Sequence, residues 1–221
     1  MAKTALLKSS IAKKVAMALS GLFLILFLAQ HLFINSLSLF GPDTFNSVSQ
    51  FMGYNPLVQF VVQPILIIAL VFHFIMGLVL DNRNRMARPI KYAQYNGAAN
   101  ATWASRHMLL TGLVVLAFLG LHLYDFWFSE MDYKYLSANP IDAARFYPEL
   151  LAKFVSPVRT GLYCLAFILL GFHLWHGFNS SFQSVGFNNK YSKALHKLGY
   201  AFAVVVPAGF IFIALFHHFN Q

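Results

Sequence analysis

Five long apolar stretches constrain this chain more than any other feature of its sequence. They cover residues 14–38, 57–80, 107–128, 158–180 and 198–219. Each is close to the length that a helix needs to cross a hydrocarbon layer of ~30 Å. None shows the alternation of a barrel strand, and a helix satisfies its own backbone hydrogen bonds inside lipid. The sequence therefore predicts an all-α integral membrane protein, in which residues 1–221 form a single bundle of five transmembrane helices.

The segments between the stretches contain residues that interrupt helices. Proline occurs in three of these connections: the first has Gly41-Pro42 and Pro56, the second has Pro89, and the third has Pro140, Pro148 and Pro157. The connection 129–156 is the longest, and its sequence predicts a short surface helix over 141–154.

Basic residues are distributed unevenly between the two sides of such a bundle. Twelve of the 16 Lys and Arg residues lie before the first stretch or in the second and fourth connections: Lys3, Lys8, Lys13, Lys14, Arg83, Arg85, Arg88, Lys91, Arg106, Lys190, Lys193 and Lys197. Asp81 is the one acid on that side, and the other six acids lie opposite. The positive-inside rule then predicts a cytoplasmic N-terminus and an outer C-terminus. The net charge of +9 reflects this topology and does not indicate a nucleic-acid-binding protein.

Four histidines lie deep inside four different stretches. Counted at ~1.5 Å per residue from the basic side, His73 and His173 are both about 10 Å deep, and His31 and His122 are both roughly 22 to 26 Å deep. Because polar residues are costly in lipid, embedded histidines are functional candidates. Two imidazoles can hold a haem iron from both faces and leave no open position, which suits electron transfer. The sequence thus predicts two bis-histidine haem sites stacked across the membrane.

The alternative for each of these residues is a neutral histidine that hydrogen-bonds a neighbouring helix. A weak internal repeat favours the cofactor hypothesis, since a glycine follows one turn after each inner histidine, as in His73 to Gly77 and His173 to Gly177. A glycine there leaves room for a broad, flat group, although membrane helices also use glycine for ordinary packing.

Further polar residues could contact such a cofactor or a quinone. Arg106, Arg83 and His176 lie toward the basic side, where they could donate to haem propionates or simply face the interface. On the outer side Gln30, Gln63 and Asp125 are quinone candidates. For Asp125 the alternative is an interfacial acid. His217 and His218 end the last stretch, either exposed or bordering a quinone pocket.

Six local motifs surround these residues. They are AQHLF at His31, VFHFIMG at His73, RNRMARPIKY at 83–92, WASRHMLLTG at 103–112, LGLHLYDFW at His122 and GFHLWHGFNSSFQ at His173. Together they resemble the di-haem cytochrome b subunit of bacterial succinate dehydrogenases and fumarate reductases, in its single-chain form with five helices. The resemblance covers the first four helices and their connections, and the fifth matches by hydropathy alone.

This resemblance implies a complete functional scheme. His73 with His173 would ligate the inner haem b, and His31 with His122 the outer one. A flavoprotein with FAD and an iron-sulfur subunit would dock on the cytoplasmic face of a bacterial cytoplasmic membrane, and electrons would pass from succinate through both haems to menaquinone. The single cysteine, Cys164, cannot hold an iron-sulfur cluster, so these clusters belong to the partner. Gly171 stands where some relatives carry an acid near the fourth ligand.

Three other hypotheses remain open at this stage. The chain could be the di-haem cytochrome b of a formate dehydrogenase or a hydrogenase. It could be a membrane di-iron enzyme, although such a site needs several histidines at one depth. It could also be a membrane anchor or transporter that contains no haem.

Overall fold

Helices account for the secondary structure throughout the parts of the chain that the computed structural model describes, which are residues 9–87, 103–187 and 189–220. Five continuous helices are long and apolar enough to cross a membrane: Ser10–Phe40, Val58–Met86, Met108–Leu136, Pro157–Ser184 and Ser192–Phe219. The prediction of an all-α chain with five helices able to cross a membrane is therefore confirmed for the described residues. Several of the predicted basic residues and one predicted proline lie outside the described residues: Lys3, Lys8, Arg88, Pro89 and Lys91.

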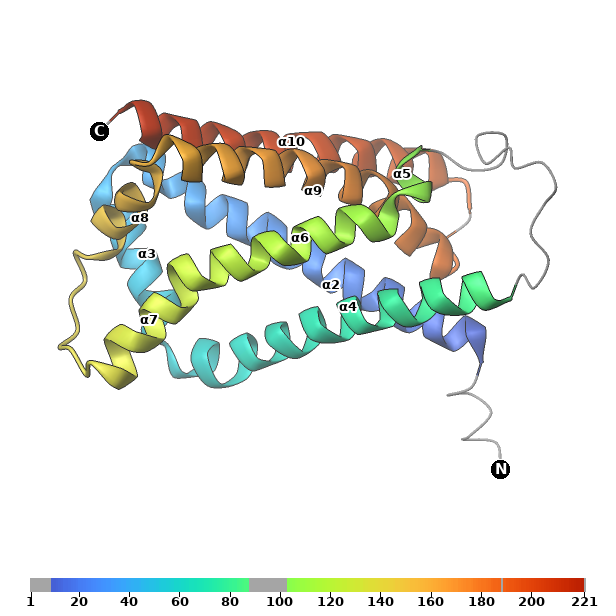
Figure 1. Cartoon of the computed structure of the whole chain (residues 1–221), viewed down its shortest axis with the longest axis horizontal. Coiled ribbons are helices and arrows are strands. Elements are labelled where there is room, and N and C mark those ends of the chain that lie inside the picture. Colours follow the sequence, from blue (N-terminus) through green and yellow to red (C-terminus); the bar gives the residue numbers. More distant parts are fainter. Residues whose placement is uncertain (1–8, 88–102, 188, 221) are drawn as a thin grey trace.

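The elements follow one another in alternating directions along the bundle (Figure 1). The first hairpin contains α2 (Ser10–Ser36), the 3₁₀ turn Leu37–Phe40, α3 (Pro42–Tyr54), the π turn Val58–Val62 and α4 (Gln63–Met86). The second contains α5 (Trp103–Arg106), α6 (Met108–His122), the π turn Leu123–Phe128, α7 (Ser129–Met131), the π turn Asp132–Leu136, α8 (Phe146–Phe154) and α9 (Pro157–Ser184). The last helix, α10, covers Ser192–Phe219.

The short helices gather at the two ends of this bundle (Figure 1). We call the end that carries α3, α7 and α8 the α8 end, and the opposite end, where α2 starts and α5 lies, the α5 end. The described residues of the predicted basic side, such as Arg83, Arg106 and Lys190, lie at the α5 end, whereas Arg145 and Glu149 lie at the α8 end.

The transmembrane helices extend beyond the predicted stretches. The second helix continues to Met86 instead of 80, and the third continues through π turns to Leu136 instead of 128. Pairs one turn apart support these extensions, with Asp81 bonded to Arg85 and Glu130 to Lys134. Hydropathy alone marks the lipid-facing part of a helix, so it cannot locate an end that lies among charged residues.

Two elements of the α8 end differ from the sequence-based expectation. The short helix predicted over 141–154 is α8, which begins later, at Phe146. Helix α3 was not predicted at all, although Pro42 and Asp43 are ordinary first-turn residues after Gly41, whose φ of 113° favours glycine.

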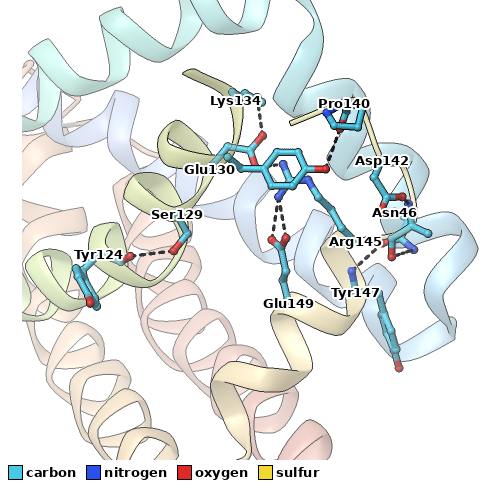
Figure 2. Close-up of polar contacts among 12 residues, drawn as sticks. Asn46, Tyr124, Ser129, Glu130, Lys134, Pro140, Asp142, Arg145, Tyr147 and Glu149 are labelled. Atoms are coloured by element: carbon cyan, nitrogen blue, oxygen red, sulfur yellow. Dashed lines mark hydrogen bonds and ion pairs between the residues drawn. The ribbon is translucent and has the colours of Figure 1, made fainter. Parts of the chain in front are cut away.

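A network of charged side chains around the buried Arg145 holds the α8 end together. Figure 2 shows Arg145 between Glu130 and Glu149, with Lys134 bonded to the same Glu130 carboxylate. The distances are 2.9 Å from Arg145 Nη1 to Glu149 Oε1 and 2.6 Å from Lys134 Nζ to Glu130 Oε1. Burial by itself lowers the pKa of Arg145, but its hydrogen bonds to both glutamates outweigh burial and raise the pKa above its ordinary value. Arg145 therefore remains a cation that joins the turn after α6 to α8.

Helix α3 is attached to α8 by a polar contact as well. The Asn46 side chain donates to the Ala144 carbonyl at 3.2 Å and accepts from the Tyr147 amide at 2.7 Å (Figure 2). These two bonds satisfy backbone groups just before and within the start of α8. They fix the two short helices as one unit over the α8 end.

Helices α9 and α10 form the most closely packed pair in the bundle. A Cβ atom at Gly171 would lie 3.1 Å from the Ala203 carbonyl oxygen, and one at Gly199 would lie 2.6 Å from a Phe178 ring carbon. Glycine thus allows the two backbones to approach closely. By contrast, α4 contains no buried residue and packs mainly along α2. The bundle is therefore closely packed between α9 and α10 and loosely covered around α4.

Candidate functional site

The inner two histidines meet across the bundle. His73 projects from α4 and His173 from α9, and their ring centres are 6.4 Å apart with an angle of 71° between the planes. Both rings are partly buried between helices. The two helices belong to different hairpins and are a hundred residues apart in sequence, so the fold itself creates this pair.

The outer two histidines also meet. His31 on α2 and His122 on α6 have ring centres 5.7 Å apart and nearly perpendicular planes, at 87°. A phenylalanine one turn earlier stacks on each ring, Phe27 on His31 and Phe118 on His122. The structure therefore brings the four rings together in the two pairs that the depth count predicted.

The two pairs lie at different levels of the bundle. Ser20 contacts the ring of His73, and His31 follows eleven residues later on the same helix. Thr111 contacts the ring of His173, and His122 again follows eleven residues later. Eleven helical residues correspond to about 16 Å along the helix axis. The inner pair is nearer the α5 end, and the outer pair is nearer the α8 end.

The spacing of the rings fits a shared metal atom. Two imidazoles that bind one metal through bonds of about 2 Å each have ring centres about 6 Å apart. The observed separations of 5.7 Å and 6.4 Å both agree with that value. In addition, Nδ1 of His122 is buried without a hydrogen-bond partner in the described part of the chain. Such an orphaned nitrogen is expensive unless something else satisfies it.

Methionine side chains occupy the space beside the two repeated glycines. A Cβ at Gly77 would lie 3.6 Å from Cε of Met17, and one at Gly177 would lie 3.3 Å from Cε of Met108. The expected flat opening next to these glycines is therefore filled by two flexible side-chain ends. Methionine adapts its shape easily, so these two side chains are flexible parts of the lining at this place.

Two further glycines, Gly21 and Gly112, lie directly against the rings of the inner histidines. A Cβ at Gly21 would lie 3.3 Å from Cε1 of His73, and one at Gly112 would lie 3.4 Å from Cε1 of His173. Both glycines directly follow the hydroxyl residues Ser20 and Thr111 in sequence. The backbones of α2 and α6 are thus close to the ring edges of the inner pair.

The three candidates for the edge of a cofactor all lie toward the α5 end. Arg83 is exposed in the last turn of α4, Arg106 is exposed at the end of α5, and His176 is partly buried one turn after His173. Next to Arg106, His107 stacks on Trp103 with ring centres 4.3 Å apart. Arg83 and Arg106 are thus free to reach an anion near this end.

The three quinone candidates lie in different environments. Gln30 is exposed on α2 beside His31, and Gln63 is partly buried at the start of α4. Asp125 is only 1% exposed, so its carboxylate is surrounded by protein. Its Oδ2 accepts a hydrogen bond of 2.8 Å from Tyr163 on α9, and Arg159 lies 3.6 Å from its Oδ1. The π turn that begins after His122 changes the face on which Asp125 lies, and a count at 3.6 residues per turn does not include that change.

The last helix ends in a buried histidine. His217 is 1% exposed, and its Nε2 lies 2.8 Å from the Ser38 hydroxyl, while Nδ1 of His218 lies 2.8 Å from the Phe154 carbonyl. Of the two alternatives for His217, exposure is therefore excluded. These contacts attach α10 to the 3₁₀ turn after α2 and to α8.

Ser20, Thr111 and Tyr163 contact the histidines or Asp125 but were missed as site residues. A signal for the first two was present in the sequence. Residues 17–32, MALSGLFLILFLAQHL, and residues 108–123, MLLTGLVVLAFLGLHL, are identical at eight of sixteen aligned positions. Ser20 aligns with Thr111, Gly21 with Gly112 and His31 with His122. The repeat of the two hairpins thus includes their first helices as well as the His-x-x-x-Gly motif.

Comparisons with known proteins do not assign this chain to a family. Neither the family models, nor the curated proteins, nor the solved structures contained a match to this chain. Within the described residues, no group of three or more His, Cys, Asp or Glu side chains is arranged to hold a metal ion. The candidate site therefore consists of two histidine pairs.

Proposed function

We propose that this chain is the di-haem cytochrome b subunit of a succinate:quinone oxidoreductase. The observation that supports it most is the meeting of four embedded histidines as two pairs, with ring centres 5.7 Å and 6.4 Å apart at two levels of one bundle. Independent neutral histidines have no reason to pair at metal-sharing distance twice, on four helices. When bound, two haems b supply one-electron carriers inside the membrane.

The chain's own residues have distinct roles in this proposal. His73 and His173 hold the inner iron and His31 and His122 the outer iron, so both sites are closed to further ligands. Aromatic rings around the outer pair, such as Phe27 and Phe118, exclude water from it. At the α5 end, Arg83, Arg106 and His176 are placed to pair with haem propionates.

The α5 end is the proposed docking face for the partner subunits. Exposed basic residues at this end include Arg83, Arg106, Lys190, Lys193 and Lys197. By the positive-inside rule this end is cytoplasmic, and the C-terminus is then outside. A flavoprotein and an iron-sulfur subunit would bind here, on the side nearer the inner histidine pair. Menaquinone would bind near the outer pair, where Gln30, Gln63 and Asp125 are the polar candidates.

A visible spectrum of the purified full chain tests this proposal. The reduced-minus-oxidised difference spectrum should contain bands of two b-type haems, and succinate should reduce them once the two partner subunits are added. A chain expressed with sufficient haem that shows no b-type bands would refute the proposal. Two haems that formate or hydrogen reduces through another partner, and succinate does not, would identify a different membrane dehydrogenase.

A further inference from the structure

The hydrogen bonds of Ser20 define which nitrogen of His73 carries a proton. The Ser20 hydroxyl lies 2.8 Å from the Met17 carbonyl oxygen and 3.0 Å from Nδ1 of His73. A hydroxyl has one proton, and a carbonyl oxygen can only accept. The proton of Ser20 therefore points to Met17, and its oxygen is left as an acceptor. Nδ1 of His73 must then be the donor, which leaves Nε2 with the free electron pair.

The same arrangement occurs in the second hairpin. The Thr111 hydroxyl lies 3.0 Å from the Met108 carbonyl oxygen and 3.4 Å from Nδ1 of His173. By the same reasoning Thr111 accepts from Nδ1–H, although this contact is longer than the first. In both rings it is Nδ1 that contacts the hydroxyl.

We propose that Ser20 and Thr111 are positioning residues, whose hydroxyls accept the Nδ1–H of His73 and His173 and so present both Nε2 electron pairs to a shared metal. The identity of that metal as haem iron rests on the function proposed above. The hydrogen bonds and the tautomer do not depend on it.

The neighbouring glycines make this orientation possible. Because Gly21 and Gly112 have no Cβ, the Nδ1–Cε1 edges of the two rings lie close to α2 and α6, with Cε1 3.3 and 3.4 Å from where a Cβ would be. A larger residue would push the ring away from the hydroxyl. The two residues of each Ser-Gly or Thr-Gly pair thus act together. The hydroxyl residue accepts the hydrogen bond from Nδ1, and the glycine that follows leaves space for the ring.

Among the described residues, no hydroxyl makes an equivalent contact with the outer pair. The Asn35 amide lies 3.5 Å from both ring nitrogens of His31, and Nδ1 of His122 is buried without a partner in the described part of the chain. A hydrogen-bond acceptor at the second nitrogen makes a histidine a stronger donor to a metal and favours its more oxidised state. Loss of this acceptor should therefore raise the midpoint potential of the inner haem and leave the outer haem unchanged.

Four variants of the full chain distinguish the effect of losing the hydroxyl from the effect of changing the size of the side chain. Ser20→Ala and Thr111→Val remove the acceptor, while Ser20→Thr and Thr111→Ser keep it. Ser36→Ala is the matched control, because the Ser36 hydroxyl also bonds a carbonyl three residues earlier, that of Phe33 at 2.7 Å, but has no histidine beside it. Redox titration followed by visible and EPR spectra is the first measurement.

We expect Ser20→Ala and Thr111→Val to shift the potential and the EPR g values of one haem alone, and to weaken its retention on the order of tenfold. Ser20→Thr, Thr111→Ser and Ser36→Ala should resemble the unmodified chain. Unchanged potentials and g values in both Ser20→Ala and Thr111→Val, with both haems bound, would overturn the inference while the proposed function still stands.

A second measurement uses the unmodified chain, so it does not depend on whether a variant folds. Nitrogen-15 NMR of the full chain with labelled histidine reports the tautomer directly, in the diamagnetic reduced state or without haem. We expect protonated Nδ1 in His73 and His173. Protonated Nε2 in these two residues would overturn the inference. A chain that binds no haem but shows protonated Nδ1 would refute the proposed function and leave the hydrogen-bond assignment intact.

Discussion

Tyr163 on α9 donates a hydrogen bond of 2.8 Å to the Asp125 carboxylate, in the π turn that follows α6. Both residues are 1% exposed, and the Tyr163 ring also packs edge to face on Phe118, beside the outer histidine pair. Because the other carboxylate oxygen has no hydrogen bond among the described residues, Tyr163 is the main direct partner of a buried acid. This contact joins the two helices of the second hairpin near the α8 end.

Replacement of Tyr163 by Phe should destabilise the chain by about 1.5 to 3 kcal/mol, which is typical for a hydrogen bond to a charged group. Thermal or denaturant unfolding in detergent measures this loss. Tyr124→Phe is the control, since Tyr124 is 67% exposed one residue before Asp125 and its change should have little effect. Equal stability of the two variants would show that the Asp125 contact contributes nothing measurable.

Arg145→Met should destabilise the chain by about 1.5 to 3 kcal/mol, because it removes a charged hydrogen-bond donor from the partly buried Glu130 carboxylate and leaves Lys134 as its cation. The comparison variant is Arg85→Met, whose pair with Asp81 is mostly exposed and should contribute about 1 kcal/mol or less. Proteolysis of the connection 129–156 provides a second readout, since Arg145 attaches it to α8. Similar unfolding midpoints for both variants would contradict the importance of the network around Arg145.

The sequence predicted the parts of this fold that depend on hydropathy and depth. The five spans and the two histidine levels follow from the apolar stretches and from ~1.5 Å per residue. The helix ends could not be predicted from hydropathy, because pairs such as Glu130 with Lys134 extend helices beyond the apolar stretches. The burial of Asp125 did not follow either, because a π turn changes the face after His122. The contact between Ser20 and His73 depends on packing, although the repeat of residues 17–32 in 108–123 indicates that both positions matter.

Replacement of either histidine of a pair should remove the same haem. His31→Ala and His122→Ala should both lose the same b-type haem, and His73→Ala and His173→Ala should both lose the other, because each pair shares one metal in the proposed function. Difference spectra of the purified variants measure this. His196→Ala is a suitable control, since His196 lies on α10 beside Tyr200. A variant pair that loses different haems would exclude the proposed ligand assignment.

Gly21→Leu should disturb the inner pair selectively. Its side chain would meet Ser181 Oγ at 3.2 Å and Cε1 of His73 at 3.3 Å already at the Cβ position. We expect loss or broadening of one haem signal and a lower unfolding temperature. Gly161→Leu should be tolerated, because nothing lies within 4 Å of a Cβ at that place. Normal spectra in Gly21→Leu would mean that α2 can move away from His73 without cost.

Reporter fusions test the orientation that the basic residues predict. Alkaline phosphatase, which is active only outside the cytoplasm, should be active when fused after Gln221 and inactive when fused before Met1. Replacement of the exposed Lys190, Lys193 and Lys197 by Glu should weaken this preference and also reduce binding of the partner subunits. Activity at the N-terminal fusion alone would reverse the topology and move the docking face to the α8 end.

The duplication of the hairpins has a geometric consequence for the two histidine pairs. Helices α2 and α6 run in one direction and carry aligned histidines, and α4 and α9 run back with the other two (Figure 1). Parallel repeats can be related by a rotation about the membrane normal. A two-fold rotation that relates the two hairpins would place the midpoint of each histidine pair on its axis. In the proposed function, the spacing of the two pairs along that axis would then set how far an electron travels between them.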